Sequence, residues 1–371
     1  MRVVKLGDVC DVITRGISPI YTEDKQLGVA VLNQKCIRDK TIAYEFGRLH
    51  NLSEKSVNDS KFLKSGDVLV NSTGHGTLGR TALVENVDQP ALVDSHITIL
   101  RPANGMFVPR YFAYLIGRCE KDFVEMATGT SGQTELPRAL VSEYQISYDP
   151  SLEEQQWVVE RLDAAFEKID RAIELTEENI KNSWYLFDAF RKEKFAGGDI
   201  TKKLGEVLVL QRGYDLPKSQ RVAGEHPLVS SSGIIDNINE YKVQGPGICT
   251  GRSGSVGATF YVENNFWPLN TTLYIKDYLG NDPRYCYWLL YGLDLKQFAG
   301  GTGVPTLNRN IVHEHMVKMS QGESQKEIAN TLDTEYLLCQ DLSTKYQKKL
   351  SSLKLLKQSL LTQAFSQNEV K

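Results

Sequence analysis

Two long stretches of the chain, residues 151–196 and 321–366, place apolar side chains every three to four positions. Steps of 3.5 residues from Leu152 to Lys194 meet 13 positions, of which nine are apolar. A heptad pattern sustained over this length predicts two long helices, each with one apolar stripe. The stripe residues that we expect to pair the helices are Leu162, Phe166, Ile169, Ile173, Leu332, Tyr336, Leu350 and Leu353.

The first stretch carries a capping signal at each end. Ser151 can cap the start of the helix, and Glu154 can complete a capping box. The pair Gly197 and Gly198 is placed to end it. A helix of about 45 residues is about 65–70 Å long, and with one apolar stripe it needs a partner in order to be stable in water.

The regions before each helix, residues 1–150 and 201–320, combine short β-like runs with many glycines. Gly, Asn, Asp and Pro bound these runs, which favours strands. Pro109 and Pro283 each open an apolar run, as proline does in the first turn of a helix. The predicted strands are 68–70, 82–84 and 97–100 in the first region and 248–249, 259–262 and 273–275 in the second.

The chain is an internal repeat, because short motifs return in the same order. Their offset falls smoothly from 198 residues (Leu6 to Leu204) to 170 residues (Gln155 to Gln325), as loop deletions in the second copy would produce. The matched segments are 6–9 with 204–207, 15–16 with 212–213, 76–79 with 254–257, 109–116 with 283–290, Gly132 and Leu136 with Gly303 and Leu307, and 155–163 with 325–333.

We therefore predict an α+β chain in which two mixed α/β domains are separated by two long helices. Equivalent parts of a two-copy chain commonly relate by a pseudo-twofold axis, so we expect the helices to pack as an antiparallel coiled coil. The expected boundaries are 1–150 and 199–320 for the mixed domains and 151–198 and 321–371 for the helices. A duplicated chain of this kind suits a ligand or partner with two similar halves.

Composition narrows the class of protein. The six cysteines are scattered and form no CxxC pair, which favours reduced thiols over a zinc site or a disulfide framework. No apolar run approaches the length of a membrane span, so we expect a cytoplasmic protein. The net charge is −3, and residues 201–320 carry 12 basic and 10 acidic side chains. Any anion-binding surface must therefore be local.

The common sequence motifs of enzymes give little support for a catalytic function. It contains no P-loop motif and no Rossmann fingerprint in a βαβ context. Residues 74–79 match GxGxxG, but their copy at 252–257 does not, which favours a tight loop between strands. His313 and His315 would face the same side of a strand, yet no third metal ligand is near them. Ser72 and Ser253 lack a recurring His and Asp, so a nucleophile is disfavoured as well.

What recurs instead is a pair of glycine-rich loops with basic and polar side chains. Glycine lets the backbone approach a ligand closely. Hydroxyl groups suit phosphate, and Arg, Asn and Gln suit base edges in the major groove. An ordinary surface loop is the competing interpretation for each residue taken singly. The residues that we expect to contact DNA are Arg15, His75, Arg80, Thr130, Gln133, Arg138, Arg212, Arg252, Ser253, Thr302, Asn308 and Arg309.

With these motifs in this order, the chain resembles the specificity subunit of a type I restriction–modification system over nearly its whole length. The resemblance is carried by the opening Leu-Gly-Asp/Glu-Val, the loop 252–257, the two Gly-Thr loops 129–138 and 301–309, and the Glu-Gln and Ser-Gln starts of the helices at 154–155 and 324–325. One departure is that His75 stands near the place where the second copy has Arg252.

The resemblance implies a non-catalytic reader of double-stranded DNA. Each mixed domain would be a target-recognition domain for one half of a bipartite site. The paired helices would set the spacing and form the docking platform for two modification subunits, with the same stripe residues serving both helix pairing and docking. S-adenosylmethionine, ATP and Mg would be held by those subunits and by a restriction (translocase) subunit, with no cofactor in this chain and no membrane partner.

Two other functions are compatible with the same patterns. One is a coiled-coil scaffold whose mixed domains bind protein or glycan. The other is a similar subunit of a related two-subunit restriction system. A neighbouring gene for a methyltransferase would favour the type I system.

Overall fold

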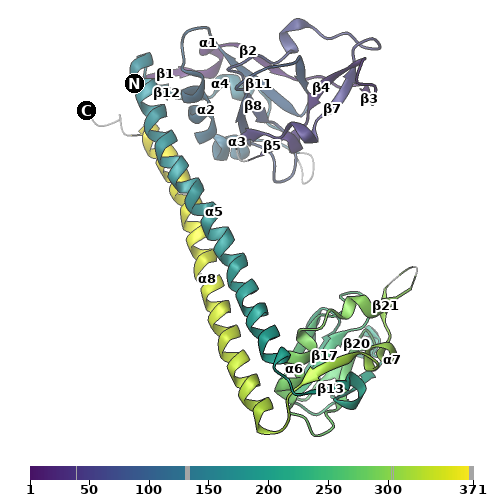
Figure 1. Ribbon diagram of the computed structural model, residues 1–371. Coiled ribbons are helices and arrows are strands. Elements are labelled where there is room, and N and C mark those ends of the chain that lie inside the picture. Colours follow the sequence, from purple (N-terminus) through teal and green to yellow (C-terminus); the bar gives the residue numbers. More distant parts are fainter. Residues whose placement is uncertain (39, 130–133, 302, 304, 367–371) are drawn as a thin grey trace. The chain divides into compact units, whose positions relative to one another are not determined.

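The two longest elements are the helices α5 (Leu152–Ala196) and α8 (Glu323–Ser366), as the heptad pattern predicts. The structure is a computed structural model that describes residues 1–38, 40–129, 134–301, 303 and 305–366. It divides into unit 1, Met1–Glu174 with Leu350–Lys371, and unit 2, Leu175–Lys349. Each unit contains one mixed region, part of α5 and part of α8 (Figure 1).

The mixed region of unit 1 is built on two four-stranded sheets. The first is antiparallel, in the order β2 (Cys10–Arg15), β11 (Ile97–Pro102), β8 (Val68–Asn71) and β9 (Thr81–Leu83). The second has the order β10 (Ala91–Val93), β4 (Gly28–Leu32), β7 (Arg48–Asn51) and β3 (Tyr21–Thr22), with β10 parallel to β4. Two ribbons complete it, β1 (Arg2–Lys5) with β12 (Gln145–Tyr148) and β5 (Ile37–Arg38) with β6 (Thr41–Ile42).

Unit 2 repeats this plan with shorter connections. Its main antiparallel sheet has the order β14 (Val209–Arg212), β20 (Thr272–Asp277), β17 (Gly247–Gly251) and β18 (Thr259–Val262). The second sheet is β16 (Gly233–Ile238), β15 (Ala223–Ser230) and β19 (Trp267–Pro268). The ribbons are β13 (Ile200–Lys203) with β23 (Met316–Met319) and β21 (Ala299–Gly300) with β22 (Thr306–Leu307). The six runs predicted as strands therefore all lie in or beside strands of the two main sheets.

The short helices also fall in equivalent places. Unit 1 has α1 (Leu6–Val9), α2 (Pro109–Arg118), α3 (Glu120–Met126) and α4 (Arg138–Glu143), and unit 2 has α6 (Pro283–Tyr291) and α7 (Arg309–His313). Pro109 and Pro283 open α2 and α6, as predicted, since proline lacks only an N–H that the first helical turn leaves unpaired.

Each unit has its own core, to which both long helices contribute. In unit 1 the ring of Tyr111 on α2 packs on Phe365 of α8, with ring centroids 5.1 Å apart. In unit 2 Tyr285 on α6 packs on Phe195 of α5 at 5.0 Å. A mixed region therefore buries its helix against the start of one long helix and the end of the other.

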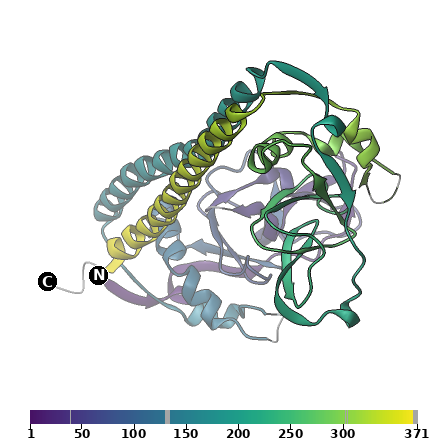
Figure 2. The same cartoon turned by 90° about the horizontal axis from the view of Figure 1, so that it is seen from below.

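Within each unit the long helices pack antiparallel, and they run side by side in Figures 1 and 2. Residue numbers rise along α5 while those of the partners on α8 fall. The joined pairs are Asp170 with Lys357, Ser183 with Cys339, and Phe187 with Tyr336. This confirms the predicted antiparallel arrangement. Leu162, Phe166, Ile169 and Leu332 are buried, and Ile173, Tyr336, Leu350 and Leu353 are half-buried.

A buried glutamine fixes each long helix to its mixed region. The side-chain oxygen of Gln155 accepts the N–H of Val108 at 2.8 Å, and that of Gln325 accepts the N–H of Asp282 at 2.8 Å. Val108 and Asp282 are the residues just before α2 and α6, so each glutamine receives an N–H from the start of a short helix. This shared contact explains why Gln recurs at the same place in both copies.

Candidate nucleic-acid interface

An Arg-Gly pair stands where the edge strand of each main sheet ends. Gly213 follows β14, and a Cβ on it would lie 2.3 Å from the carbonyl oxygen of Leu269. Gly16 follows β2 with the same kind of close backbone approach. Only glycine fits such a corner without displacing the neighbouring strand. The preceding Arg15 and Arg212 are thereby held at matched positions.

In unit 2 a groove of about 580 Å³ brings together residues that are far apart in the sequence. Arg212 comes from the end of β14, Arg252 from the loop after β17, and Asn308 and Arg309 from the start of α7. These four predicted contact residues all line the groove. Three guanidinium groups around one hollow attract an anion, and Arg and Asn can also bond base edges.

Backbone bonds hold the two loops of this groove together. Leu307 donates its N–H to the carbonyl of Arg252 at 2.8 Å, and Ser253 pairs with Thr306 in a short β-bridge. The N–H of Arg252 in turn binds the carbonyl of Thr271 at 2.8 Å. The backbone of Arg252 is thus fixed on both sides. Its half-buried side chain donates to the carbonyl of Asn270 at 3.4 Å, which reduces the conformational freedom that the side chain would lose on binding.

The first copy has no arginine at the place of Arg252. Leu136 donates its N–H to the carbonyl of Ser72 at 2.8 Å, just as Leu307 does to Arg252. Ser72 is therefore the structural counterpart of Arg252, which corrects the sequence-based placement of His75 near that position. Ser72 is buried and its hydroxyl bonds that of Thr98 at 2.6 Å. The two units consequently offer different chemistry at one equivalent point.

Arg15 is engaged within the protein more fully than its counterpart Arg212. Its guanidinium donates to Glu135 at 2.8 Å and to the carbonyls of Ser95 and Leu136 at 3.0 and 2.7 Å. Burial lowers the pKa of Arg15, and Glu135 opposes that shift. The side chain of Arg15 is 19% exposed, whereas that of Arg212 is 50% exposed and lies 3.8 Å from Asp215. Arg15 thus holds the second loop of unit 1 in place.

A polar cluster at the glycine-rich loop of unit 1 was not apparent in the sequence. The hydroxyl of Thr73 accepts an N–H from Gln34 at 2.8 Å and lies 2.8 Å from Nδ1 of His96. Gln34 and His96 come from separate segments, so no local motif joins them. Both are suited to hydrogen bonding with bases or phosphate.

The remaining predicted contact residues differ in what can be said of them. His75, Arg80 and Arg138 are exposed, and Arg80 donates to the carbonyl of Gly76 at 2.9 Å. Thr130, Gln133 and Thr302 lie outside the residues that the structure describes, as does Gly132 of the repeat.

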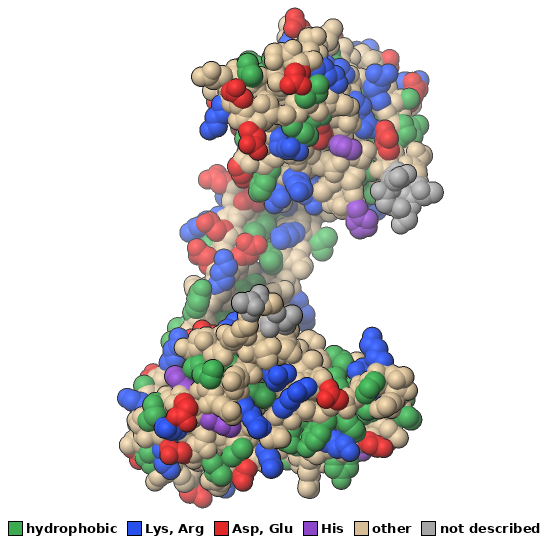
Figure 3. All heavy atoms as spheres, turned by 90° about the vertical axis from the view of Figure 1, so that its right-hand side faces the viewer, with side chains coloured by type: hydrophobic (Ala, Val, Ile, Leu, Met, Phe, Trp, Pro, Cys, Tyr) green, Lys and Arg blue, Asp and Glu red, His purple; other side chains and the backbone are tan. Residues whose placement is uncertain are grey.

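Charge is mixed on the face of the molecule seen in Figure 3. On the face seen in Figure 3, Lys and Arg side chains alternate with Asp and Glu and form no single continuous patch. This agrees with the near-neutral charge of the mixed regions. Attraction to an anion must therefore come from local groups, such as the three guanidinium groups around the groove of unit 2.

His313 has a structural position. It ends the helix α7 and does not lie on a strand as its spacing from His315 suggested. Its Nε2 accepts the N–H of Leu210 at 2.9 Å. Burial, and then the charge of Arg309, lower the pKa of His313, which suits a neutral acceptor. Among the described residues no group of three or more His, Cys, Asp or Glu is placed to hold a metal ion.

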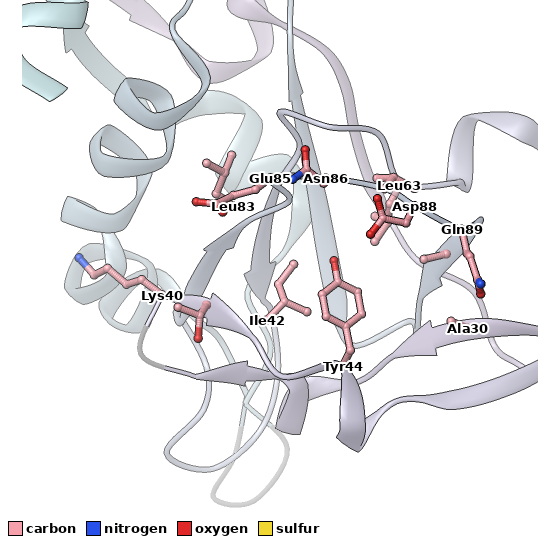
Figure 4. A pocket seen from close by; sticks show the side chains of 13 residues that line it. Ala30, Lys40, Ile42, Tyr44, Leu63, Leu83, Glu85, Asn86, Asp88 and Gln89 are labelled. Atoms are coloured by element: carbon pink, nitrogen blue, oxygen red, sulfur yellow. The ribbon is translucent and has the colours of Figure 1, made fainter. Parts of the chain in front are cut away.

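A second hollow, of about 600 Å³, lies in unit 1 away from these loops. Figure 4 shows Ile42 beside Tyr44, Leu83 beside Glu85 and Leu63 beside Asp88, with Lys40 at one side. None of the predicted contact residues lines it. The two carboxylates of this hollow disfavour an anionic ligand.

The long helices also present apolar side chains to solvent. Tyr185 and Leu186 on α5 are 71% and 70% exposed, and Leu337 and Leu338 on the facing part of α8 are 62% and 57% exposed. They are apolar residues at positions outside the heptad stripe, and this position in the sequence was a signal that could have revealed them. Exposed apolar patches of this kind mark interaction surfaces. No helix in the described part of the chain could span a membrane.

Comparison with known proteins decides the family. The family model "Type I restriction modification DNA specificity domain" matches residues 1–183 and again residues 200–352. The chain belongs to this family. It is a type I specificity subunit that recognises DNA, and its two copies are two specificity domains.

Solved structures share the fold of this specificity subunit. A chain from "Structural basis underlying complex assembly and conformational transition of the type I R-M system" has a TM-score of 0.79 at 17% identity, with 98% of this chain and 97% of that chain covered. The HsdS subunit from Thermoanaerobacter tengcongensis has a TM-score of 0.58 at 17% identity, covering 98% and 96%. No curated protein matches the sequence.

Proposed function

We propose that each mixed region reads one half of a bipartite DNA site. The observation that carries this proposal is the groove of unit 2, where Arg212, Arg252, Asn308 and Arg309 converge from three segments. Guanidinium and amide groups in a groove supply both phosphate attraction and hydrogen bonds to base edges. The equivalent loops of unit 1 supply His75, Arg80 and Arg138, together with the predicted contacts Thr130 and Gln133. In unit 2, Thr302 is the further predicted contact.

The two half-sites should differ in sequence. In the loop after β8 or β17, unit 1 carries Ser72 where unit 2 carries Arg252. In the Gly-Thr loop, just after the matched Leu136 and Leu307, unit 1 carries Pro137 where unit 2 carries Asn308. Buried Ser72 cannot reach a base as an arginine does, and proline offers no side-chain donor. The complete site is therefore asymmetric, although the chain is a repeat.

The chain itself carries no catalytic role in this proposal. Methylation with S-adenosylmethionine belongs to modification subunits, and ATP- and Mg-dependent restriction belongs to a restriction subunit. We place the docking of two modification subunits on the exposed apolar side chains of the long helices: Tyr185, Leu186, Leu337 and Leu338 in unit 2, and Trp157, Leu355 and Leu356 in unit 1. The buried stripe supports this surface by pairing the helices.

The experiment is an exchange of one region. The chain is expressed with its modification subunit, and methylated adenines are mapped across the genome. Replacing residues 201–320 by the corresponding region of another family member should change one half of the methylated motif and leave the other. Replacing residues 1–150 is the matched exchange and should change the opposite half. A change in both halves, or in neither, would contradict two independent readers.

A further inference from the structure

The edge strands β2 and β14 hold a basic side chain at the same place, although it comes from different parts of the chain. Thr14 and Gln211 are equivalent, since each is followed by the Arg of the Arg-Gly corner. In unit 2 Arg309 donates to the side-chain oxygen of Gln211 and to the carbonyl of Leu210 at 3.5 Å. Its guanidinium is thereby fixed at the edge of the main sheet, facing the groove.

In unit 1 the sequence counterpart of Arg309 is Arg138, yet a different cation occupies the edge position. Lys61, from a short 3-10 helix (Asp59–Lys61), donates its ammonium group to the hydroxyl of Thr14 at 2.6 Å and to the carbonyl of Arg15. These are the same two kinds of acceptor that Arg309 uses: the side chain of the edge residue and a neighbouring backbone carbonyl. Lys61 and Arg309 thus bind the side chains of equivalent edge residues, although the repeat does not align them and the carbonyl that each binds lies on the opposite side of that residue along the strand.

The charge on Lys61 is not neutralised by a carboxylate. In the part of the chain that the structure describes, neither Lys61 nor Arg309 forms an ion pair, whereas Arg15 is paired with Glu135. Burial lowers the pKa of Lys61, and the charge of Arg138 lowers it further. A half-buried ammonium group that already spends two donors on the protein has one donor left. An anion that approached it would relieve both the lost solvation and the repulsion from Arg138.

We propose that Lys61 and Arg309 are equivalent phosphate-binding cations, one in each recognition region, that bind the DNA backbone at the edge of the main sheet. This inference rests on the proposed DNA-reading function and names a contact that the repeat could not reveal. Both side chains are fixed by protein acceptors before DNA arrives, so little side-chain entropy is lost on binding. A phosphate contact fixes the position of the protein on the duplex without selecting a base.

The test compares the effect on DNA affinity of removing the charge at either of two nearby lysines. It uses the full chain together with its modification subunits. The probe is a short duplex that carries the motif mapped for the unaltered protein, and affinity is measured at several salt concentrations. Lys61→Gln removes the charge but keeps a donor for Thr14, and Lys61→Arg keeps the charge. Lys64→Gln is the matched control, because Lys64 is exposed three residues away. Arg309→Gln is the corresponding variant in unit 2.

We expect Lys61→Gln and Arg309→Gln each to lower the slope of log affinity against log salt by about 0.9, the value for one phosphate contact. When the salt concentration rises fourfold, the affinity of both proteins falls. The fold-loss of the variant should be smaller than that of the unaltered protein by a factor of roughly 3.5. Lys61→Arg and Lys64→Gln should keep the original slope, and the methylated motif should stay the same in all variants. A purely structural role would lower stability without this change in slope.

Three results would overturn the inference: an unchanged slope for Lys61→Gln, a Lys61→Arg variant that behaves like Lys61→Gln, or a change in the methylated motif. The last would make Lys61 a base contact. If the unaltered complex itself bound the probe no better than a scrambled duplex, the proposed function would fail. That result is distinct from a specific complex whose affinity is indifferent to Lys61.

Discussion

Arg284 on α6 forms a two-point contact with Asp333 on α8, its Nε lying 2.7 Å from Oδ1 and 2.8 Å from Oδ2. The same carboxylate accepts the indole N–H of Trp288 at 2.8 Å. In unit 1 the equivalent Arg110 pairs with Asp163, with Nε and Oδ2 3.0 Å apart. The repeated Arg and Asp are therefore a joint between each mixed region and a long helix, not a DNA contact.

This joint should contribute to the stability of unit 2. Replacing Arg284 by Ala removes one of the two donors described above, so the partly buried Asp333 keeps the Trp288 indole N–H. The substitution also removes the guanidinium that lies over the Tyr261 ring. We expect a loss of about 1–3 kcal/mol in the free energy of unfolding, typical of a hydrogen bond to a charged group. Denaturant unfolding measures it. Arg110→Ala is the matched control, with a smaller loss expected because its side chain is 48% exposed.

Arg252 should carry base specificity in unit 2. If its guanidinium bonds a guanine through two N–H groups, Arg252→Ala should weaken binding by about 1–3 kcal/mol and relax the motif at one position. The measurement is the affinity for a set of duplexes with single changes in that half-site. A uniform loss across all duplexes would instead assign Arg252 to a phosphate. Wild-type affinity for every duplex would remove it from the interface.

His313 makes unit 2 sensitive to acid. The folded state holds the pKa of His313 below the ordinary value of 6.5, so the unfolded chain binds the proton more readily. Stability should therefore be complete above about pH 6.5 and fall as the pH drops below it. Comparing denaturant midpoints at neutral and mildly acidic pH measures this. His313→Gln, which keeps an acceptor for the N–H of Leu210, should show a smaller dependence on pH; an equal dependence would contradict the assignment.

The long helices should set the spacing of the half-sites. Adding one heptad at matched places in α5 and α8 keeps the apolar stripes in register and lengthens the pair by about 10 Å. At about 3.4 Å per base pair this corresponds to roughly three base pairs. Mapping methylated adenines should show a longer gap between unchanged half-sites, with weaker binding because the recognition regions also rotate around the duplex.

The control for this prediction is a heptad added to α5 alone. It makes α5 one heptad longer than α8, so the contacts that both helices make with the mixed regions can no longer form at both ends, and methylation should be abolished. An active protein with both heptads and an unchanged gap would show that the helices do not determine the distance.

The sequence by itself determined the plan of the protein. A period of 3.5 residues specifies a helix with one stripe wherever it occurs, so α5 and α8 could be predicted almost to the residue. The repeat identified Gln155 as the equivalent of Gln325, and Gly16 as the equivalent of Gly213. Both copies need a glutamine and a glycine at these places because the same local contact is made in each. These features depend on short-range rules of backbone geometry and packing, which a linear pattern records.

Only the tertiary structure decided which side chains meet. Ser72, not His75, stands in the place of Arg252, and Arg15 turns inward to Glu135 while Arg212 does not. Lys61 reaches Thr14 across 47 residues of chain, where the second copy uses Arg309. A position at the edge of a sheet can be filled from any segment that folds next to it, so no motif or spacing records which residue does so. The choice is made by long-range packing, through contacts between residues that the sequence keeps apart.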